Sequence, residues 1–229
     1  QNFTLVAAAD ISNEKRRRIL ERIFFHDILN DAGCLRGYSE LLHDSEPVDM
    51  VEYADVIYNM SDSMIEDIIS QQELSAAENN ELKTMVEEFE ILPVLHDIIE
   101  NYKKHSVAEN KILKVSEESK NQIINTDRKL FRRVVGNLIK NALEAVKEGE
   151  KVEVFCTHEK DFTIINVANT GVIPRPIQLQ IFQRSFSTKG QGRGLGTYSI
   201  KLFTEKYLHG QISFICTPEN GTVFELKIP

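Results

Sequence analysis

The feature that most constrains the fold is a change of hydrophobic pattern after the first third of the chain. From Ile11 to about Gln72, apolar residues recur at steps of mostly three and four, which marks one apolar stripe on each of two helices. The stripe residues are Phe24, Ile28, Ala32, Leu35 and Leu42, then Ala54, Ile57, Met60, Met64 and Ile68. A polar break at residues 43–47 ends in a proline, which suits the first turn of a new helix. This part is predicted to be an all-α helical hairpin.

A two-helix hairpin leaves its apolar stripes half exposed. Pairing two hairpins across a two-fold axis buries them in a four-helix bundle, so we expect a homodimer. After a polar stretch at 71–80, helical pattern alternates with short β-like runs at 111–115, 151–157, 162–168, 211–216 and 222–228. This alternation predicts a second domain, an α+β sandwich with helices on one face of a mixed sheet.

Composition excludes several classes of protein. The 27 basic and 35 acidic residues give a net charge of −8, which argues against a nucleic-acid partner. The longest apolar stretch, residues 3–9, is too short to cross a bilayer. Three widely spaced cysteines without a C-x-x-C pair are typical of reduced thiols in a cytosolic protein. We expect a cytoplasmic portion of a longer protein, attached to a membrane, if at all, through a missing N-terminal region.

A histidine in the first predicted helix has chemically suitable neighbours. Asn30 lies one turn beyond His26 on the same face, and Asp27 flanks that face. A neutral imidazole is a nucleophile near pH 7, and an adjacent carboxylate can orient the ring and accept its proton. An ordinary surface or capping histidine is the alternative, whereas a zinc site is disfavoured because no other histidine lies three or four residues away.

Two glycines continue the face of His26. Gly33 and Gly37 each cost about 1 kcal/mol relative to alanine inside a helix. One explanation is that the absence of side chains at these two positions lets another protein approach the helix closely. The alternatives are a kink in the helix or relief of crowding within the bundle.

Two patterns in the second part favour a nucleotide site. In a predicted helix at 137–145, Asn137 and Asn141 offer two carboxamides one turn apart to a hard cation such as Mg²⁺, and Lys140 lies beside them for a phosphate. A solvated polar helix face is the alternative.

Residues 187–197 form a glycine-rich loop that runs into a helix, where a backbone can approach an anion closely. The loop fits neither the P-loop nor the Rossmann pattern, so we interpret it as a phosphate lid, with a flexible linker as the alternative.

Together these segments resemble the sensor histidine kinases of two-component systems over nearly the whole chain. Residues 26–30 look like the family's H-box, 137–145 like its N-box, 182–189 like its F-box and 192–196 like its second glycine box. The resemblance implies a dimerization and histidine phosphotransfer domain at 1–77. It implies a Bergerat-type (histidine kinase-like ATPase) catalytic domain at 78–229.

The resemblance also implies an activity and the residues that carry it. His26 would be phosphorylated from ATP with Asp27 as general base, and the phosphoryl group would pass to an aspartate of a response regulator. Asn30 would position water when a phosphorylated regulator is hydrolysed, and Asn141 would bind Mg²⁺. The implied ATP-binding residues are Asn137, Lys140, Asn141, Asn169, Gly171, Thr188, Lys189, Gly192, Arg193, Gly194, Leu195, Gly196 and Thr197.

One box departs from the family pattern. Where D-x-G-x-G is usual, the chain has Asn169, Gly171 and Ile173 at the three fixed positions. The family's aspartate accepts a hydrogen bond from the adenine amino group; Asn169 keeps a carbonyl acceptor, but its NH₂ end can rotate into the same place. The alternative function is therefore a weak or inactive pseudokinase that serves as a dimeric docking scaffold. An ATPase of the gyrase, chaperone or mismatch-repair type ranks last, because Arg132 and Arg133 stand where that class has a glutamate.

Overall fold

The computed structural model describes residues 12–44, 49–183 and 196–229. The described residues up to Ser75 form one compact unit, and those from Ala76 onward form another. In these ranges no helix combines the length and the apolar character needed to span a membrane. The two units are described in turn.

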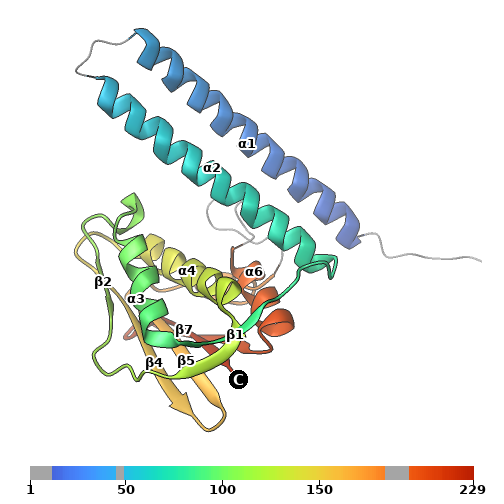
Figure 1. Ribbon diagram of the computed structural model, residues 1–229, viewed down its shortest axis with the longest axis vertical. Helices are drawn as coiled ribbons and strands as arrows, with labels where there is room; N and C mark the ends of the chain where they lie inside the picture. The colour runs from blue at the N-terminus through green and yellow to red at the C-terminus, as the bar shows by residue number, and fades with distance from the viewer. Residues whose placement is uncertain (1–11, 45–48, 184–195) are drawn as a thin grey trace, which may run out of the picture. The chain divides into compact units, whose positions relative to one another are not determined.

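The first unit consists of two long helices, α1 (Ser12–Asp44) and α2 (Met50–Glu78), which lie side by side (Figure 1). The rings of Tyr38 on α1 and Tyr53 on α2 contact each other, with centroids 6.2 Å apart. The predicted helical N-terminal part is confirmed. The sequence predicts that the helical pattern ends near Gln72, whereas α2 continues to Glu78. Residues 71–78 are good helix formers, and two of them, Leu74 and Ala77, are buried.

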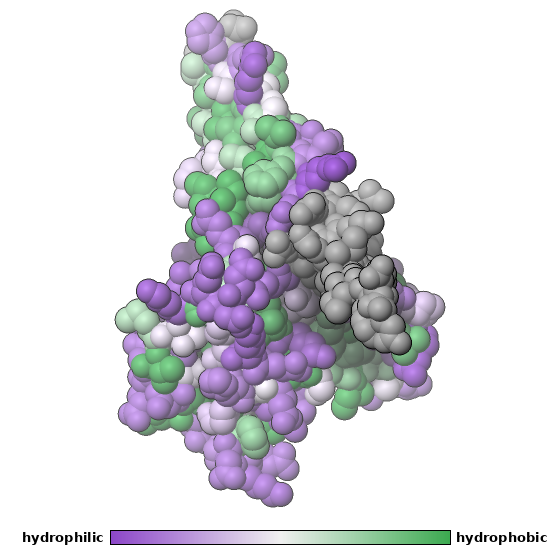
Figure 2. Space-filling view, turned by 90° about the vertical axis from the view of Figure 1, so that its right-hand side faces the viewer, coloured by the Kyte–Doolittle hydropathy of each residue, from purple (hydrophilic) through white to green (hydrophobic). Residues whose placement is uncertain are grey.

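Apolar side chains remain exposed along this hairpin (Figure 2). The large ones are Phe25, Leu29, Leu41, Met50, Val51, Tyr58, Ile65 and Ile69. Val51, Tyr58 and Ile65 recur every seven residues, so they form one stripe along α2. The hairpin therefore presents an unpartnered apolar stripe within a single chain.

The second unit is built on a five-stranded mixed sheet. The strands are β2 (Ile112–Val115), β4 (Lys151–Glu159), β5 (Phe162–Asn169), β6 (Gln211–Thr217) and β7 (Gly221–Ile228). Their order is β2-β4-β5-β7-β6; β2 pairs parallel with β4, and the other neighbours are antiparallel. All five runs predicted from the sequence are strands of this sheet.

Helices cover one face of the sheet (Figure 1). They are α3 (Ile91–Tyr102), α4 (Arg128–Ala145) and α6 (Gly196–Leu202), which continues as a π-helical turn (Phe203–Tyr207); shorter turns are η1 (Ser106–Ala108) and α5 (Arg175–Gln178). Residues of β4 alternate between buried, such as Val152 and Val154, and accessible positions such as Glu153. Such alternation is typical of a sheet with one covered face, which confirms the predicted sandwich.

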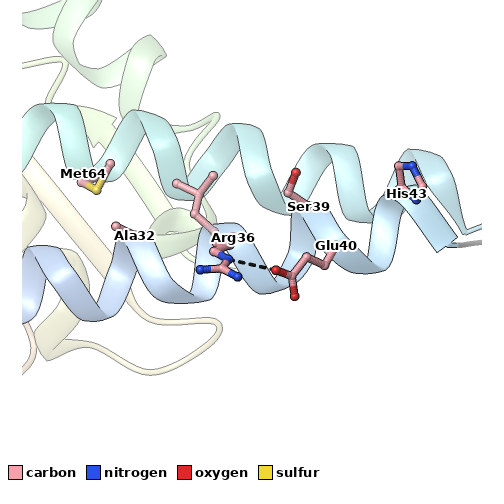
Figure 3. A pocket seen from close by; sticks show the side chains of 7 residues that line it. Ala32, Arg36, Ser39, Glu40, His43 and Met64 are labelled. Carbon is pink, nitrogen blue, oxygen red and sulfur yellow. Dashed lines mark hydrogen bonds and ion pairs between the residues drawn. The ribbon is translucent and has the colours of Figure 1, made fainter.

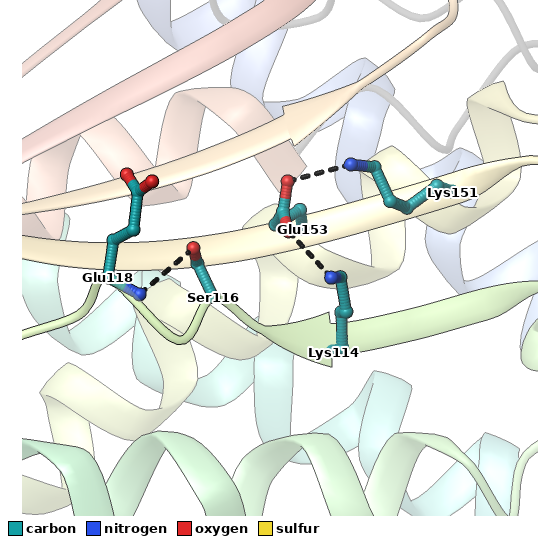
Figure 4. Close-up of polar contacts among 5 residues, drawn as sticks. All are labelled: Lys114, Ser116, Glu118, Lys151 and Glu153. Atoms are coloured by element: carbon teal, nitrogen blue, oxygen red, sulfur yellow. Dashed lines mark hydrogen bonds and ion pairs between the residues drawn. The ribbon is translucent and has the colours of Figure 1, made fainter.

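The accessible face of β4 carries an ion-pair cluster (Figure 4). Glu153 accepts hydrogen bonds or ion pairs from Lys151 Nζ at 2.8 Å and from Lys114 Nζ, on the neighbouring strand β2, at 3.2 Å. The hydrogen bond from Lys151, followed by that from Lys114, lowers the pKa of the Glu153 carboxyl below its usual value. This cluster joins the edge strand β2 to the rest of the sheet.

A second, two-stranded antiparallel sheet was not predicted from the sequence. It pairs β1 (Val86–Glu90) with β3 (Ile123–Asp127). Strand β1 has the sequence Val-Glu-Glu-Phe-Glu, and only its Phe89 is buried, so its pattern does not indicate a strand. At the end of β3, Asp127 caps α4 by accepting the Leu130 N–H at 2.8 Å. Its other carboxylate oxygen accepts the Met85 N–H at 2.6 Å, which ties the small sheet to the start of α4.

Candidate functional site

The histidine cluster lies on the surface of α1. The His26 side chain is 72% exposed, and its Nδ1 lies 3.5 Å from Asp27 Oδ1 and 3.1 Å from Asn30 Nδ2. The three residues are therefore together, as the helical spacing predicts. Both neighbours contact Nδ1, and neither contacts Nε2.

The two contacts favour different tautomers of the ring. When Nδ1 carries the proton, it donates to Asp27, and Nε2 keeps the lone pair that a nucleophile needs. When Asn30 donates its N–H to Nδ1, the ring proton lies on Nε2, which then has no lone pair to offer. Asp27 therefore favours the nucleophilic form at Nε2, and an Asn30 donor favours the other.

A groove between the two helices of the hairpin lies further along α1 (Figure 3). Its volume is about 610 Å³, and it is lined by Ala32, Leu35, Arg36, Ser39, Glu40, His43 and Met64. The Arg36 guanidinium and the Glu40 carboxylate pair across one turn at 2.9 Å. Side-chain atoms built on Gly33 or Gly37 would meet nothing within 4 Å, so these glycines do not relieve crowding inside one chain. A helix kink, close packing between two chains of the bundle and the approach of another protein stay as the explanations for them.

The second site centres on α4. The helix buries Leu138, Ala142 and their neighbours in the core, which leaves Asn137, Lys140 and Asn141 half-buried on the opposite side. The Nδ2 atom of Asn141 is buried and has no hydrogen-bond partner among the described residues. An unsatisfied buried amide costs about 1–3 kcal/mol, so this carboxamide is suited to a ligand.

The start of α6 stands beside that carboxamide. A Cβ atom at Gly196 would lie 3.9 Å from both Nδ2 and Oδ1 of Asn141. The structure thus brings Gly196 and Asn141 together across 55 residues of sequence. The part of the chain that is described holds no group of three or more His, Cys, Asp or Glu side chains able to bind a metal.

The loop after β5 lies at the C-terminal end of α4. A Cβ atom at Gly171 would lie 2.6 Å from the Ala145 carbonyl oxygen, so only glycine fits there without movement. Asn169 is 6% exposed, and its Nδ2 donates to the Gly171 carbonyl at 3.4 Å. This bond turns the amide so that Oδ1 remains as an acceptor. Asn169 therefore presents the same kind of group as the aspartate it replaces, without the charge.

The predicted F-box and the residues around it are described in part. The ring of Phe182 packs edge-on against those of Phe214 and Phe224, with centroids 5.9 Å and 6.3 Å away. The Thr197 hydroxyl donates to the Ile181 carbonyl, which joins the start of α6 to this segment. Six predicted ATP-binding residues lie outside the described ranges: Thr188, Lys189, Gly192, Arg193, Gly194 and Leu195.

The two arginines near the start of α4 have structural contacts. Arg132 pairs with Asp97 on α3 at 3.4 Å. The Arg133 guanidinium lies over the Phe203 ring, 5.4 Å from its centroid, and burial lowers its pKa to about 10. The Arg133 side chain is therefore cationic at neutral pH and cannot activate water as a general base.

Two further residues at this site escaped the sequence analysis. Thr222 and Cys216 hydrogen-bond with the loop at 169–173, and their strands place them directly across from one another in register. Neither residue belongs to a sequence motif used above. Only the pairing of β6 with β7 brings them to the loop.

Comparison with known proteins finds a family profile that matches most of the second unit and relatives that align with most of the chain. A family profile described as "Histidine kinase-, DNA gyrase B-, and HSP90-like ATPase" matches residues 126–229. Sporulation kinase A of Bacillus subtilis (strain 168) is 25% identical over 206 residues, which cover 89% of this chain. The match covers 33% of that relative, so the chain spans about a third of its length.

Two solved structures share the fold. The catalytic domain of histidine kinase ThkA, in a nucleotide-free form, is 26% identical with a TM-score of 0.58, covering 64% of this chain and 96% of that one. The complex of histidine kinase ThkA with response regulator protein TrrA aligns with 97% of this chain and 67% of that one at a TM-score of 0.60 and 20% identity. At that identity the second likeness shows the fold alone.

Proposed function

Because the chain belongs to the sensor histidine kinase family, we propose that it phosphorylates its own His26 from ATP and passes the phosphoryl group to an aspartate of a response regulator. One observation carries the proposal. A single chain combines the exposed cluster of His26, Asp27 and Asn30 with an ATPase-type unit in which the buried Asn141 Nδ2 has no hydrogen-bond partner among the residues that the structure describes.

The proposed reaction follows from the geometry at His26. With the Nδ1 proton donated to Asp27, the Nε2 lone pair attacks the γ-phosphorus of ATP. The new N–P bond forms as the bond to the β,γ-bridging oxygen breaks, and ADP leaves with that electron pair. The positive charge on the ring is relieved when Nδ1 passes its proton to Asp27, which acts as the general base.

In the proposed nucleotide site, Asn141 holds Mg²⁺, and Asn137 and Lys140 lie near the phosphates. When bound, the cation supplies neutralisation of the developing phosphate charge. Asn169 and Gly171 lie at the nucleobase of ATP, and Asn169 Oδ1 accepts a hydrogen bond from the adenine amino group. The same proposal assigns the phosphate lid to Thr188, Lys189, Gly192, Arg193, Gly194, Leu195, Gly196 and Thr197.

We further propose that residues 1–77 are the dimerization and phosphotransfer domain and that residues 78–229 are the catalytic domain. The exposed apolar stripe of the hairpin supports a homodimer built as a four-helix bundle. The open glycine face of α1 supports docking of the regulator's receiver domain near His26, where Asn30 positions water for phosphatase activity. A cytoplasmic location belongs to the same proposal.

Incubation with γ-labelled ATP and Mg²⁺ tests the proposal. We expect label that survives alkali and is lost in acid, because a phosphoramidate at His26 has that stability. His26→Ala should abolish the label, and His43→Ala, a control on the same helix, should retain it. Label in the His26→Ala protein would contradict the assignment of the nucleophile.

Binding of a fluorescent ATP analogue separates a kinase from a docking scaffold. Asn141→Ala should weaken Mg²⁺-dependent binding at least tenfold, because it removes the buried carboxamide. Asn101→Ala, which removes an exposed carboxamide from α3, is the control and should bind as the wild type does. A folded wild-type protein that binds no nucleotide would favour the scaffold.

A further inference from the structure

The loop after β5 is held by side chains from two neighbouring strands. Asn169 at the end of β5 lies across from Thr222 on β7, and Thr222 lies across from Cys216 on β6. Side chains directly opposite one another in an antiparallel sheet point to the same face. The three residues therefore form one row that ends beneath the loop at 170–174.

Two loop groups bond to this row. The Ile173 N–H donates to Cys216 Sγ at 3.2 Å, and the Gly171 carbonyl accepts the Thr222 hydroxyl at 2.7 Å. Thr222 Oγ1 and Cys216 Sγ are themselves 3.3 Å apart. Thr222 is 1% exposed, and Cys216 is half-buried.

The number of available hydrogens fixes the direction of each bond. A carbonyl oxygen can only accept, so the single hydroxyl hydrogen of Thr222 goes to Gly171. The thiol hydrogen of Cys216 then has Thr222 Oγ1, at 3.3 Å, as its nearer acceptor and the Ile173 carbonyl oxygen, at 3.8 Å, as the more distant one. The result is a closed chain in which Ile173 N–H donates to the thiol, the thiol to the hydroxyl, and the hydroxyl to the Gly171 carbonyl.

We propose that Cys216 is a positioning residue of the nucleotide-binding loop. Its thiol both accepts from Ile173 and donates to Thr222, and so it fixes the loop shape that places Gly171 against α4 and orients Asn169. The nucleotide part of this inference rests on the proposed function. The statement that the thiol links Ile173 to Thr222 rests only on the contacts within the second unit.

Ile173, which the Cys216 thiol holds, is one of the two positions at which the chain departs from the usual D-x-G-x-G pattern. Ile173 occupies the place of the second glycine of the usual D-x-G-x-G pattern. The Ile173 backbone is fixed on both sides, because its carbonyl accepts from Gln178 Nε2 at 2.7 Å and its N–H meets Cys216. Side-chain hydrogen bonds thus define the loop where glycine would leave the backbone free.

Two substitutions separate hydrogen bonding from packing. Cys216→Ser keeps one donor and one acceptor, whereas Cys216→Val fills the space and has neither. We expect Cys216→Val to expose the Ile173 amide to at least tenfold faster hydrogen exchange, measured by NMR. We expect the same variant to raise the Kd for a Mg²⁺–ATP analogue about tenfold, since a lost hydrogen bond to a buried group has that effect. Cys216→Ser should stay within about threefold of wild type in both measurements.

Cys156→Val is the matched control, because it removes a buried thiol from β4 of the same sheet, away from the loop. It should leave the Kd and the exchange of the Ile173 amide unchanged. Wild-type values in Cys216→Val, or equal losses in Cys216→Ser and Cys216→Val, would overturn the proposal. If the wild type binds no nucleotide, the proposed function fails, and the exchange of the Ile173 amide alone decides whether the thiol bridges the loop.

Discussion

His26 and Asn141, the two side chains on which the proposed chemistry depends, have contrasting surroundings. His26 projects from the surface of α1, where both of its contacts are made by neighbours on its own helix. Asn141 has a buried amide without a partner among the described residues, and it faces the start of α6. The proposed nucleophile therefore depends on its adjacent residues for its tautomer, whereas the proposed ligand-binding amide depends on tertiary packing for its position.

Replacing Asp27 tests the origin of the nucleophilic tautomer. Asp27→Asn removes the group that takes the Nδ1 proton, so we expect autophosphorylation to slow by about 10²–10⁴-fold. The initial rate of labelling measures the effect, with nucleotide affinity unchanged. Asp62→Asn, which removes an exposed carboxylate from α2, is the control for loss of charge. An Asp27→Asn protein that labels at the wild-type rate would contradict the role of Asp27.

Glu153 provides a pH-dependent contribution to stability. Its folded-state pKa is lowered, first by the hydrogen bond from Lys151, so its stabilising effect is present above the unfolded pKa and is lost as the pH falls through the folded value. Glu153→Gln should lower the free energy of unfolding by about 0.2–1 kcal/mol at pH 7, and the difference should shrink as the pH falls through the lowered folded-state pKa. Urea titrations at a series of pH values from 7 downward measure it. Glu118→Gln, on the neighbouring turn, is the comparison, and a difference between Glu153→Gln and wild type that stays constant with pH would refute the prediction.

Among the elements, α4 contributes most to the second site, because one of its faces packs in the core and the other carries candidate site residues. One face packs into the core, and the other carries Asn137, Lys140 and Asn141. Its first turn is set by Asp127, and its last carbonyls meet the loop at Gly171. A shift of this helix would therefore move both parts of the proposed nucleotide site together.

The cap of α4 can be tested by its effect on stability. Asp127→Ala removes the acceptor for the Leu130 N–H and also the acceptor for the Met85 N–H, so we expect a loss of about 2 kcal/mol. Asp127→Asn keeps a capping oxygen and should lose less. Urea unfolding of the second unit measures both variants. Equal, small losses in the two would show that the cap contributes little.

The sequence predicts local features of these elements better than distant ones. His26 and Asn30 are brought together by a single helical turn, and the five main strands have clear apolar patterns. Strand β1 was missed because three of its five residues are glutamates, and the last part of α2 was missed because the apolar stripe was followed only to about Gln72. The thiol chain at Cys216 depends on the register of β6 against β7, which no local pattern encodes.

Across the whole molecule, the two units differ in how completely they bury their apolar residues. The second unit has a continuous core in which helices cover one face of a sheet. Among its described side chains, the hairpin leaves eight large apolar ones exposed in a single chain. Exposed apolar surface arranged at seven-residue intervals is characteristic of a helix that pairs with another copy.

Sedimentation of the chain and of a fragment tests this difference. The full chain should be a dimer, and a fragment of residues 76–229 should be a folded monomer. The fragment retains Ala77, whose carbonyl accepts from Lys206 Nζ at 3.1 Å and from the Tyr207 hydroxyl at 2.7 Å. Ile65→Glu should convert the full chain to a monomer, because it places a charge in the hairpin stripe.

Ile215→Glu is the control for that experiment, since Ile215 is 69% exposed on β6 of the other unit. It should leave the dimer intact. A monomeric wild-type chain would contradict the proposed bundle. A dimeric fragment would show that the dimer contact lies in the second unit.

The three cysteines differ in a way that suits spectroscopy. Cys34 is exposed on α1, eight residues beyond His26, whereas burial raises the pKa of the Cys156 thiol to about 11. At neutral pH the Cys156 thiol is ionised in roughly one molecule in 10⁴, and Cys216 is engaged with the loop, so a maleimide reagent should modify Cys34 first. A spin label would then occupy one place per chain, close to the proposed phosphate acceptor. In a two-fold dimer the paired labels would give a distance, and changes in that distance would follow the movement of the helices during signalling.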